Sequence, residues 1–233
     1  MFAVGGGGDC RMSSGGVAAY AKPEPIARRA PCALPAMRFS DVRVAAAESS
    51  AELEAAHALV QERYRWRGYD INAGDLHAEA EARQEITFLA ANRDVALGTL
   101  TLRLDGPRGL RAEGNHGHLV EGARVAGKRV CELTRLAVAD GVTSRPVLAA
   151  LFNLAFAAAE ALHGVTDVFI EVNPRHVAFY SRILGFVAVT GETFCERVQA
   201  PSVLLHVEMS ALGGRLRALA RRALLPPVLL QVA

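Results

Sequence analysis

Cysteine is scarce in this chain of 233 residues, and the cysteines that are present show no pairing pattern. The four cysteines form no C-x-x-C motif, which excludes the common zinc-site and disulfide-framework signatures. His116 and His118 share a glycine-rich stretch but lack the paired spacing of metal ligands. We therefore expect no bound metal, and reduced thiols in a cytoplasmic protein.

Strong charge of one sign and long apolar runs are also missing. Lys and Arg number 26 against 24 Asp and Glu, so the net charge of +2 gives no reason to expect a nucleic-acid partner. No apolar segment has the unbroken length of a membrane span, and the N-terminus lacks a signal-peptide pattern. The hydrophobic fraction of 51% supports one substantial core, and therefore one domain with appendages.

Composition divides the chain into three parts. Residues 1–37 are rich in Gly, Ala, Pro and Ser without periodicity, which predicts a disordered N-terminal extension. Residues 38–210 have the alternating patterns of a folded domain. Residues 211–233 combine four arginines with leucine and alanine, which predicts a basic amphipathic tail that packs on the domain or rests on an anionic membrane surface.

The first half of the domain predicts a strand, a helix and a β-hairpin. The strand covers Val42–Ala46, and apolar residues at helical spacing after Glu48 predict a helix that ends near Gly68. Ile86–Ala91 and Val95–Leu104 flank the turn residues 92–94, and the second of them alternates apolar and polar residues, which is typical of a hairpin. The stretch 106–127 is glycine-rich and is predicted to be a loop with a short helix.

The second half alternates strands and helices, which predicts an α/β domain with at least one parallel strand pair. Its predicted elements are, in order, a strand Arg129–Val138, a helix Arg145–His163, a strand Thr166–Asn173, a helix Pro174–Leu184 and closing strands Phe186–Thr190 and Ser202–Met209.

Two charged side chains interrupt an otherwise apolar strand. Cys131–Val138 reads C-E-L-T-R-L-A-V, so that Glu132 and Arg135 fall in a segment with the character of an inner strand. Burial of charge is costly unless the charge is paired, so the two side chains serve either a reaction or a structural ion pair between them. Simple alternation puts them on opposite faces, so they share one site only where a bulge or strand splay intervenes.

Several segments carry a resemblance to known acyltransferases. The string N-P-x-x-x-x-F-Y-x-x-x-L-G-F, from Asn173 to Phe186, resembles the GNAT acyltransferase superfamily. More narrowly, the chain resembles the long-chain N-acyl amino acid synthases, which are related to acyl-homoserine-lactone synthases. The segments that carry this resemblance are E-R-Y-R-W-R-G-Y at 62–69, I-T-F-L-A-A at 86–91, G-T-L-T-L at 98–102, E-L-T-R-L-A-V at 132–138 and D-V-F-I-E-V-N-P-R-H at 167–176.

The resemblance implies an α/β fold of the GNAT type: a mixed, mostly antiparallel sheet flanked by helices, with a splayed parallel strand pair. It also implies transfer of a long-chain acyl group from an acyl-carrier-protein thioester to the amine of an amino acid. Such a reaction needs a base, an oxyanion site and an acid for the leaving thiolate. The match assigns Glu132 as the base, with Arg135 beside it. It places Tyr180 near the leaving sulfur, although a tyrosine there also packs the helix on the sheet.

The donor is expected to lie along the splayed strand, at Leu136, Ala137 and Val138. Before the central helix, Val142–Val147 lacks the glycines that hold the pyrophosphate of acetyl-CoA in many GNAT enzymes, and Pro146 has no N–H to donate. This loop favours the single phosphodiester of a carrier protein over acyl-CoA. The residues expected to contact the donor there are Ser144, Arg145 and Asn173, the last of which also suits a helix cap.

Cations are expected at two further places. The acceptor carboxylate needs a guanidinium, and Arg63, Arg67 or Arg135 is a candidate. An acidic carrier protein needs a basic docking surface. Its candidate residues are Lys128, Arg129, Arg145, Arg175 and Arg182.

Two other functions fit the same fold. The chain is alternatively an acetyl-CoA-dependent N-acetyltransferase, which needs no long apolar tunnel, or a non-catalytic module that binds an acyl thioester or its carrier protein. The charges at Glu132 and Arg135 argue against a module without turnover, because a scaffold has no need of them in an inner strand. The C-terminal tail has a further possible role besides packing on the domain or on a membrane, which is to cover an acyl tunnel.

Overall fold

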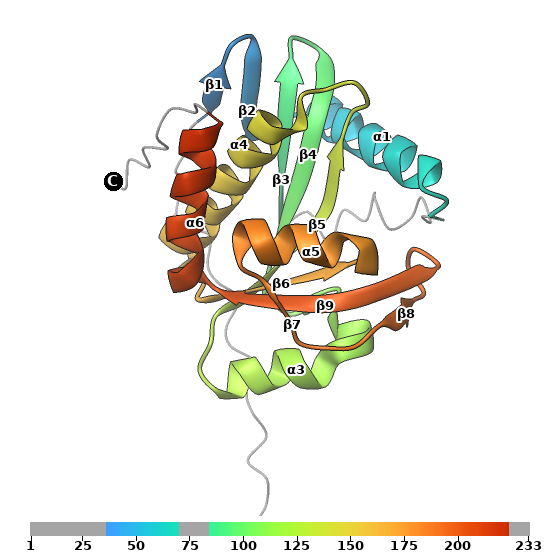
Figure 1. The fold of residues 1–233 in the computed structure, drawn as a ribbon, viewed down its shortest axis with the longest axis vertical. Helices are drawn as coiled ribbons and strands as arrows, with labels where there is room; N and C mark the ends of the chain where they lie inside the picture. Colours follow the sequence, from blue (N-terminus) through green and yellow to red (C-terminus); the bar gives the residue numbers. More distant parts are fainter. Residues whose placement is uncertain (1–35, 70–83, 224–233) are drawn as a thin grey trace, which may run out of the picture.

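The fold is built on one mixed sheet of nine strands, seen in a computed structural model that describes residues 36–69 and 84–223 (Figure 1). The strand order is β1-β2-β3-β4-β5-β6-β9-β7, with β8 paired to β9. The strands are β1 (Met37–Phe39), β2 (Val42–Ala46), β3 (Glu85–Asn92), β4 (Val95–Leu104), β5 (Val130–Val138), β6 (Asp167–Val172), β7 (Val187–Ala188), β8 (Thr193–Cys195) and β9 (Ala200–Glu208). All pairs are antiparallel except β5 with β6, which confirms the predicted sheet.

The first helix and the hairpin follow the sequence patterns. Helix α1 (Ser50–Trp66) begins at a capping box, in which Ser49 Oγ accepts from the Glu52 N–H and the Glu52 side chain accepts from the Ser49 N–H. Strands β3 and β4 form the predicted hairpin, and on one face Thr87 and Thr101 join their hydroxyls at 3.1 Å. Prediction therefore succeeded where capping and alternation were clear.

Helices α4 and α6 and the segment after β6 pack together on one face of the sheet. Helix α4 (Ser144–Ala157) continues into a π-helical turn (Ala158–Leu162) and packs on the main core with α6 (Met209–Arg222). The segment after β6 runs from a 3₁₀ turn (Pro174–His176) through α5 (Val177–Phe179) to a π turn (Tyr180–Leu184) and joins the same core. Gly185 ends it with φ of 83°, as its left-handed cap requires.

The region 106–127 differs from its prediction as a loop with a short helix. Helix α3 (Glu113–Val125) fills most of its second half and packs on Val130, Phe169 and Leu204, on the face opposite α4. Three glycines inside the helix, together with a kink at His116, hid this periodicity from the sequence pattern.

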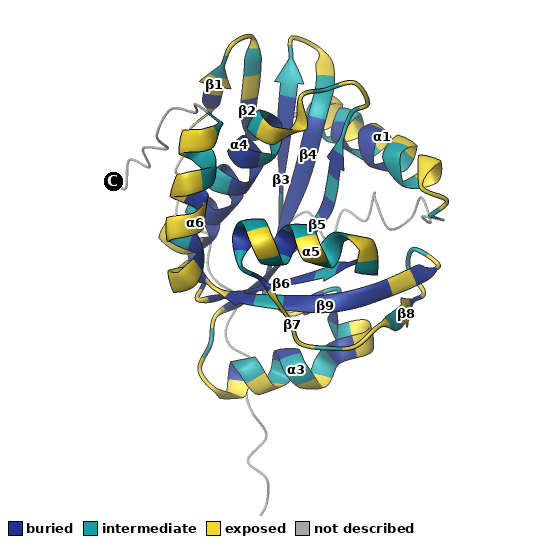
Figure 2. Ribbon diagram, viewed as in Figure 1, coloured by how far each residue is buried: buried dark blue, intermediate teal, exposed yellow. Residues whose placement is uncertain are grey.

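The two ends of the described chain also extend the predicted domain. Met37 is buried and pairs with Val44 in β1, so the folded part begins inside the segment 1–37, of which residues 1–35 lie outside the described residues. Helix α6 begins at Met209 and buries Leu212 and Leu216 against the core, while its arginines lie on the exposed side (Figure 2). The described part of the tail therefore packs on the domain.

Helix α4 with its π turn, Ser144–Leu162, is long and apolar enough by length and composition to cross a membrane. This differs from the expectation that no segment reaches that length. Its best window is 56% buried inside the protein, as expected for a central core helix. Val147 and Leu151 on this helix approach β4 so closely that a Cβ at Gly98 would lie 2.6 Å from Val147 Cγ1.

Candidate active site

The parallel strands β5 and β6 pair for only part of their length and then separate. Their ladder joins Val130–Glu132 to Asp167–Phe169, and no pair follows. The segments that continue past this point, Leu133–Val138 and Ile170–Asn173, line opposite walls of a cavity of about 560 Å³. The predicted splay is therefore present, and it opens a cavity of the size of a small-molecule site.

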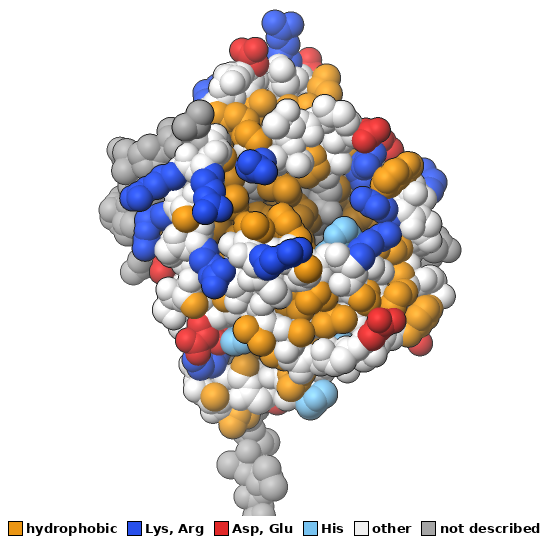
Figure 3. All heavy atoms as spheres, in the orientation of Figure 1, with side chains coloured by type: hydrophobic (Ala, Val, Ile, Leu, Met, Phe, Trp, Pro, Cys, Tyr) orange, Lys and Arg blue, Asp and Glu red, His pale blue; other side chains and the backbone are white. Residues whose placement is uncertain are grey.

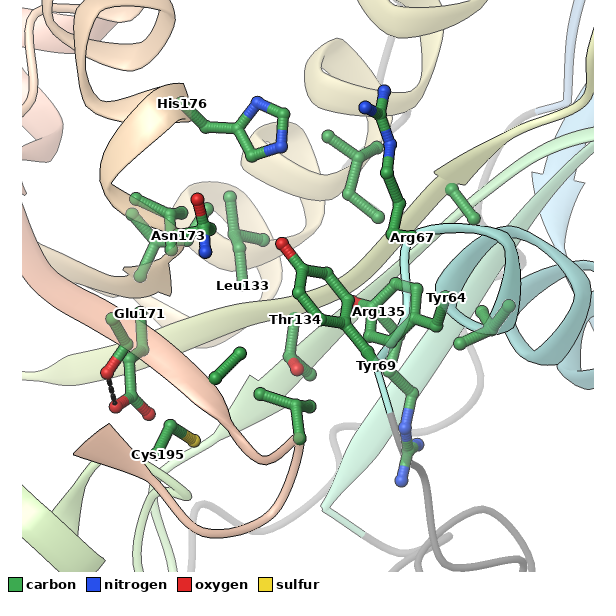
Figure 4. A pocket seen from close by; sticks show the side chains of 18 of the residues that line it. Tyr64, Arg67, Tyr69, Leu133, Thr134, Arg135, Glu171, Asn173, His176 and Cys195 are labelled. Carbon is green, nitrogen blue, oxygen red and sulfur yellow. Dashed lines mark hydrogen bonds between the residues drawn. The ribbon is translucent and has the colours of Figure 1, made fainter.

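Side chains from several elements converge on this cavity. In Figure 4, Glu171 and Cys195 lie on one side, Tyr64 and Arg67 of α1 lie on the other, and His176 lies above the opening between them. Much of the remaining lining is apolar, from β5, β6, α4 and the segment after β6. Figure 3 shows the same character on the surface, where basic side chains surround an apolar hollow.

A β-bulge explains how charged residues of β5 reach one face. Thr134 pairs with Thr101 and Ala137 with Thr99, so that two residues of β5, Arg135 and Leu136, lie opposite one residue of β4. Arg135 takes the left-handed φ of 53° that the extra residue demands. The bulge that alternation required is therefore present at the predicted place.

Glu132 is buried and is held by backbone donors. Its Oε2 accepts hydrogen bonds from the N–H of Arg111 at 2.6 Å and of Ala112 at 3.2 Å, at the start of helix α3. Its Oε1 accepts from no described residue, and the side chain lines the cavity. Burial raises the pKa of the Glu132 carboxyl, against the opposing effects of the nearby Arg197 charge and the two N–H donors.

Arg135 does not pair with Glu132, so the alternative of a structural ion pair between them is wrong. The Arg135 guanidinium donates instead to Glu85 Oε2 at 2.6 Å, and Glu85 Oε1 also contacts Arg103 at 2.9 Å and Arg111 at 3.4 Å. Burial alone would raise the pKa of Glu85, but the surrounding guanidinium charges hold it below its ordinary value. The Glu85 carboxylate is thus the shared counter-ion of a buried arginine cluster.

Two tyrosines line the cavity, of which Tyr180 is buried and Tyr64 is half-buried. Tyr180 packs its ring edge-on against Phe152, Phe179 and Phe186, and its hydroxyl has no hydrogen-bond partner among the described residues. Burial raises the pKa of Tyr180, and it raises the pKa of Tyr64 to about 12. Both phenols are therefore protonated at neutral pH and are able to donate a proton or hydrogen bond.

The predicted donor contacts are partly brought together. Leu136, Ala137 and Val138 line the cavity, as does Ser144 at the start of α4. Asn173 also lines it, and its side chain caps the following turn at the Arg175 N–H. Arg145 is exposed and is not among the lining residues.

Most of the arginines predicted to bind the acceptor or the carrier protein lie at or near the cavity, but two of the basic residues predicted for docking lie elsewhere. Arg63 and Arg67 line the cavity, and both stack on the exposed Trp66. Arg175 and Arg182 belong to the segment that walls the cavity. The remaining docking candidates, Lys128 and Arg129, precede β5 and lie away from the splay, where Lys128 contacts Asp167 and Glu208.

The sequence pattern missed one charged pair of the cavity. Arg197, in the turn between β8 and β9, forms an ion pair with Glu171, and its Nη2 lies 3.7 Å from Cys195 Sγ. The turn was not assigned to any element, so nothing placed Arg197 near the site. Glu171 lies on β6, two residues after Phe169, and lines the cavity.

Similarity to solved structures agrees with this architecture. The solved structure of FeeM, an N-acyl amino acid synthase from uncultured soil microbes, is 26% identical, with a TM-score of 0.66, and the match covers 72% of this chain and 91% of that one. A putative N-acetyltransferase from Lactobacillus plantarum is 19% identical, with a TM-score of 0.53 and coverage of 72% and 98%. The AHL synthase LasI is 16% identical, with a TM-score of 0.53 and coverage of 74% and 94%. No curated protein matches the chain.

A family model decides the membership. The model described as N-acyl amino acid synthase FeeM matches residues 55–208, a range that holds every cavity residue named above. The structural neighbours confirm the GNAT-like fold, and the family sets aside the alternative of a module without turnover. The chain belongs to the FeeM family of N-acyl amino acid synthases and is an N-acyltransferase that uses an acyl thioester donor and an amine acceptor.

Proposed function

We propose that this enzyme transfers a long-chain acyl group from an acyl carrier protein to the amine of an amino acid. The observation that carries the proposal is the buried carboxylate of Glu132 on the wall of a largely apolar cavity of about 560 Å³. An acetyl group needs no such apolar volume, whereas a long acyl chain does. The family's own description names an N-acyl amino acid as the product.

In the proposed mechanism, Glu132 accepts a proton from the ammonium group of the acceptor, directly or through a water. Its raised pKa makes it a stronger base than an exposed carboxylate, and Oε1 is the oxygen left open for the proton. The freed amine attacks the thioester carbonyl. Backbone N–H groups on the separated edge of β5, from Leu133 to Val138, stabilise the oxyanion.

The tetrahedral intermediate then collapses, the C–S bond breaks and the thiolate leaves. The Tyr180 hydroxyl is protonated, lines the cavity and has no partner among the described residues, so it is the group that we assign to protonate the sulfur. Glu132 passes its first proton to solvent and then accepts the second proton from the nitrogen of the intermediate, so that a neutral amide forms, while Tyr180 regains a proton from solvent. The products are the N-acyl amino acid and the free pantetheine thiol.

The donor preference rests on the loop before α4 and on charge. Pro146 lies in the first turn of α4, where it offers no N–H to a pyrophosphate. Basic residues of the cavity wall and its surroundings, Arg63, Arg67, Arg175 and Arg182, offer an acidic carrier protein a surface beside the opening.

The test compares three donors that carry the same long acyl chain: carrier protein, CoA and pantetheine. We expect kcat/KM for the carrier-protein donor to exceed that for CoA by at least about tenfold, and Arg182→Glu to lower only the former. Arg38→Glu, at an exposed position of β1, is the matched control and should change neither. Equal use of CoA and carrier protein, with no effect of Arg182→Glu, would contradict the proposed donor.

A further inference from the structure

Two carboxylates share one face of the sheet at the cavity. Glu132 on β5 pairs in register with Phe169 on β6, and Glu171 follows Phe169 by two residues. Residues two apart in a strand point to the same side, so Glu171 lies on the face of Glu132. Both side chains line the cavity.

Glu171 is fixed in place by its neighbours. Its side chain is only 5% exposed, its Oε1 accepts a hydrogen bond from Ser202 Oγ at 2.7 Å, and His116 Nε2 lies 3.8 Å from the same oxygen. Figure 4 shows Glu171 and its hydrogen bond at the cavity wall. A carboxylate that is held in this way sets the position of the cation that pairs with it.

That cation is Arg197, whose guanidinium is only partly used. Its Nη2 donates to Glu171 Oε2 and approaches Cys195 Sγ, while Nε and Nη1 donate to no described residue. The side chain is 33% exposed and lines the cavity. A fixed guanidinium with unused donors at a cavity wall is suited to an anionic ligand.

The other arginines of the cavity contact the Glu85 carboxylate or lie at the wall formed by α1. Arg111 and Arg135 contact the Glu85 carboxylate, and Arg63 and Arg67 stack on Trp66 at the α1 wall. In an α-amino acid only one carbon separates the amine from the carboxylate, so the cation must lie beside the base. Arg197 meets this condition, because it pairs with Glu171, which lies on the face of Glu132 and lines the same cavity.

We infer that Arg197 binds the α-carboxylate of the acceptor and so makes the enzyme selective for amino acids over simple amines. The inference rests on the proposed function and names a residue for it. With the carboxylate on Arg197, the amine of the acceptor points toward Glu132. Glu171 then acts as a positioning residue, because it holds Arg197 and does not itself touch the acceptor.

The test measures a ratio that a purely structural role would not move. For wild type and Arg197→Met, kcat/KM is measured with one long-chain acyl thioester and two acceptors, an amino acid and its amide, in the same preparation. We expect the wild type to prefer the acid by about 10- to 100-fold and Arg197→Met to lose that preference, chiefly through KM for the acid. Because both acceptors meet the same folded fraction, misfolding lowers both rates and leaves the ratio unchanged.

Two further variants sharpen the result. Arg197→Lys keeps the positive charge but loses the bidentate geometry of the guanidinium, and it should retain part of the preference for the acid. The double variant Glu171→Gln with Arg197→Met removes the carboxylate that Arg197→Met alone leaves unpaired. Arg63→Met serves as the control for a cation of the opposite wall. A wild-type ratio in Arg197→Met, or a wild type that does not distinguish acid from amide, overturns the inference while N-acyl transfer stands. A wild type that acylates no amino acid overturns the proposed function instead, and the inference with it.

Discussion

Arg135 Nη1 lies 2.6 Å from Glu85 Oε2, over the intervening strand β4, although Glu132 is only three residues away in its own strand. The β-bulge at Arg135 and Leu136 lets both charged side chains lie on one face of the sheet, but each has its own partners there. Glu132 is left without an ion pair to a described arginine and remains available as a base. Arg135 joins the Glu85 cluster and stabilises the sheet around the site.

Removal of the Glu85 carboxylate should therefore destabilise the fold. Glu85→Ala removes the buried carboxylate that three guanidinium groups share, and we expect a loss of about 3–5 kcal/mol in the free energy of unfolding, measured with urea. Arg43→Ala, which breaks the exposed ion pair with Glu52, should cost less than about 1 kcal/mol. A similar small loss in both variants would contradict the role of the cluster.

The Glu85 carboxylate should also make stability depend on acid pH. Its folded pKa lies below the ordinary 4.5, so the folded state binds this proton less tightly than the unfolded state does. The stabilisation is complete above pH 4.5 and is lost as the pH falls through the lowered folded pKa. Urea unfolding between pH 6 and pH 3 should show a smaller acid loss in Glu85→Gln than in the wild type.

Glu132 should have the opposite effect on stability. Its folded pKa is raised above 4.5, so the favourable contribution is complete below that value and is lost as the pH rises through the folded pKa. Glu132→Gln removes the cost of burying the charge while the amide oxygen still accepts from Arg111 and Ala112. We expect its Tm to exceed that of the wild type at pH 8, by roughly 2–4 °C for each kcal/mol gained, with a smaller difference near pH 4.5. A lower Tm at pH 8 would show that the ionised form is the more stable one.

Tyr180 should act through its hydroxyl rather than through packing alone. Tyr180→Phe keeps the ring contacts with Phe152, Phe179 and Phe186, so its stability should stay close to the wild type. We expect kcat with a pantetheine thioester to fall by about 10²-fold, and the deficit to shrink with a thiophenyl ester, whose thiolate leaves without protonation. An equal deficit with both donors would assign Tyr180 to packing.

Gly98 should tolerate no side chain because α4 lies against it. A Cβ there meets Val147 Cγ1 at 2.6 Å and Leu151 Cδ1 at 3.2 Å. Gly98→Ala should destabilise the protein by about 1–3 kcal/mol in urea unfolding, and Val147→Ala in the same chain should recover part of that loss relative to the sum of the single variants. Strict additivity of the two changes would argue against a direct clash.

The sequence was sufficient where a local pattern carries the information. The helical spacing of apolar residues after Glu48 and the alternation in Val95–Leu104 predicted α1 and β4, because periodicity depends on near neighbours. The bulge in β5 could be deduced because Glu132 and Arg135, three residues apart in one strand, cannot otherwise lie on the same face. These features place Glu132 and Arg135 at the site.

The partners of these charges depend on contacts between distant segments, which no local pattern reports. Glu85 reaches Arg135 from 50 residues away, and the backbone donors to Glu132 come from the start of α3, a region predicted to be mainly loop. Arg197 lies in a turn without motif, and only the pairing of β8 with β9 brings it to Glu171. Sequence reasoning therefore placed Glu132 at the site but missed the groups that surround it.

The most direct test of the account is the amount of product formed by wild type and Glu132→Gln. Full-length protein is incubated with a long-chain acyl carrier protein and an amino-acid mixture, and N-acyl amino acids are quantified by mass spectrometry, with Glu160→Gln on an exposed turn as the control. We predict product in the wild type and the control, a loss of about 10²- to 10⁴-fold in kcat for Glu132→Gln, and unchanged affinity for the donor. Wild-type rates in Glu132→Gln, in a preparation that forms product, would contradict the central role of this carboxylate.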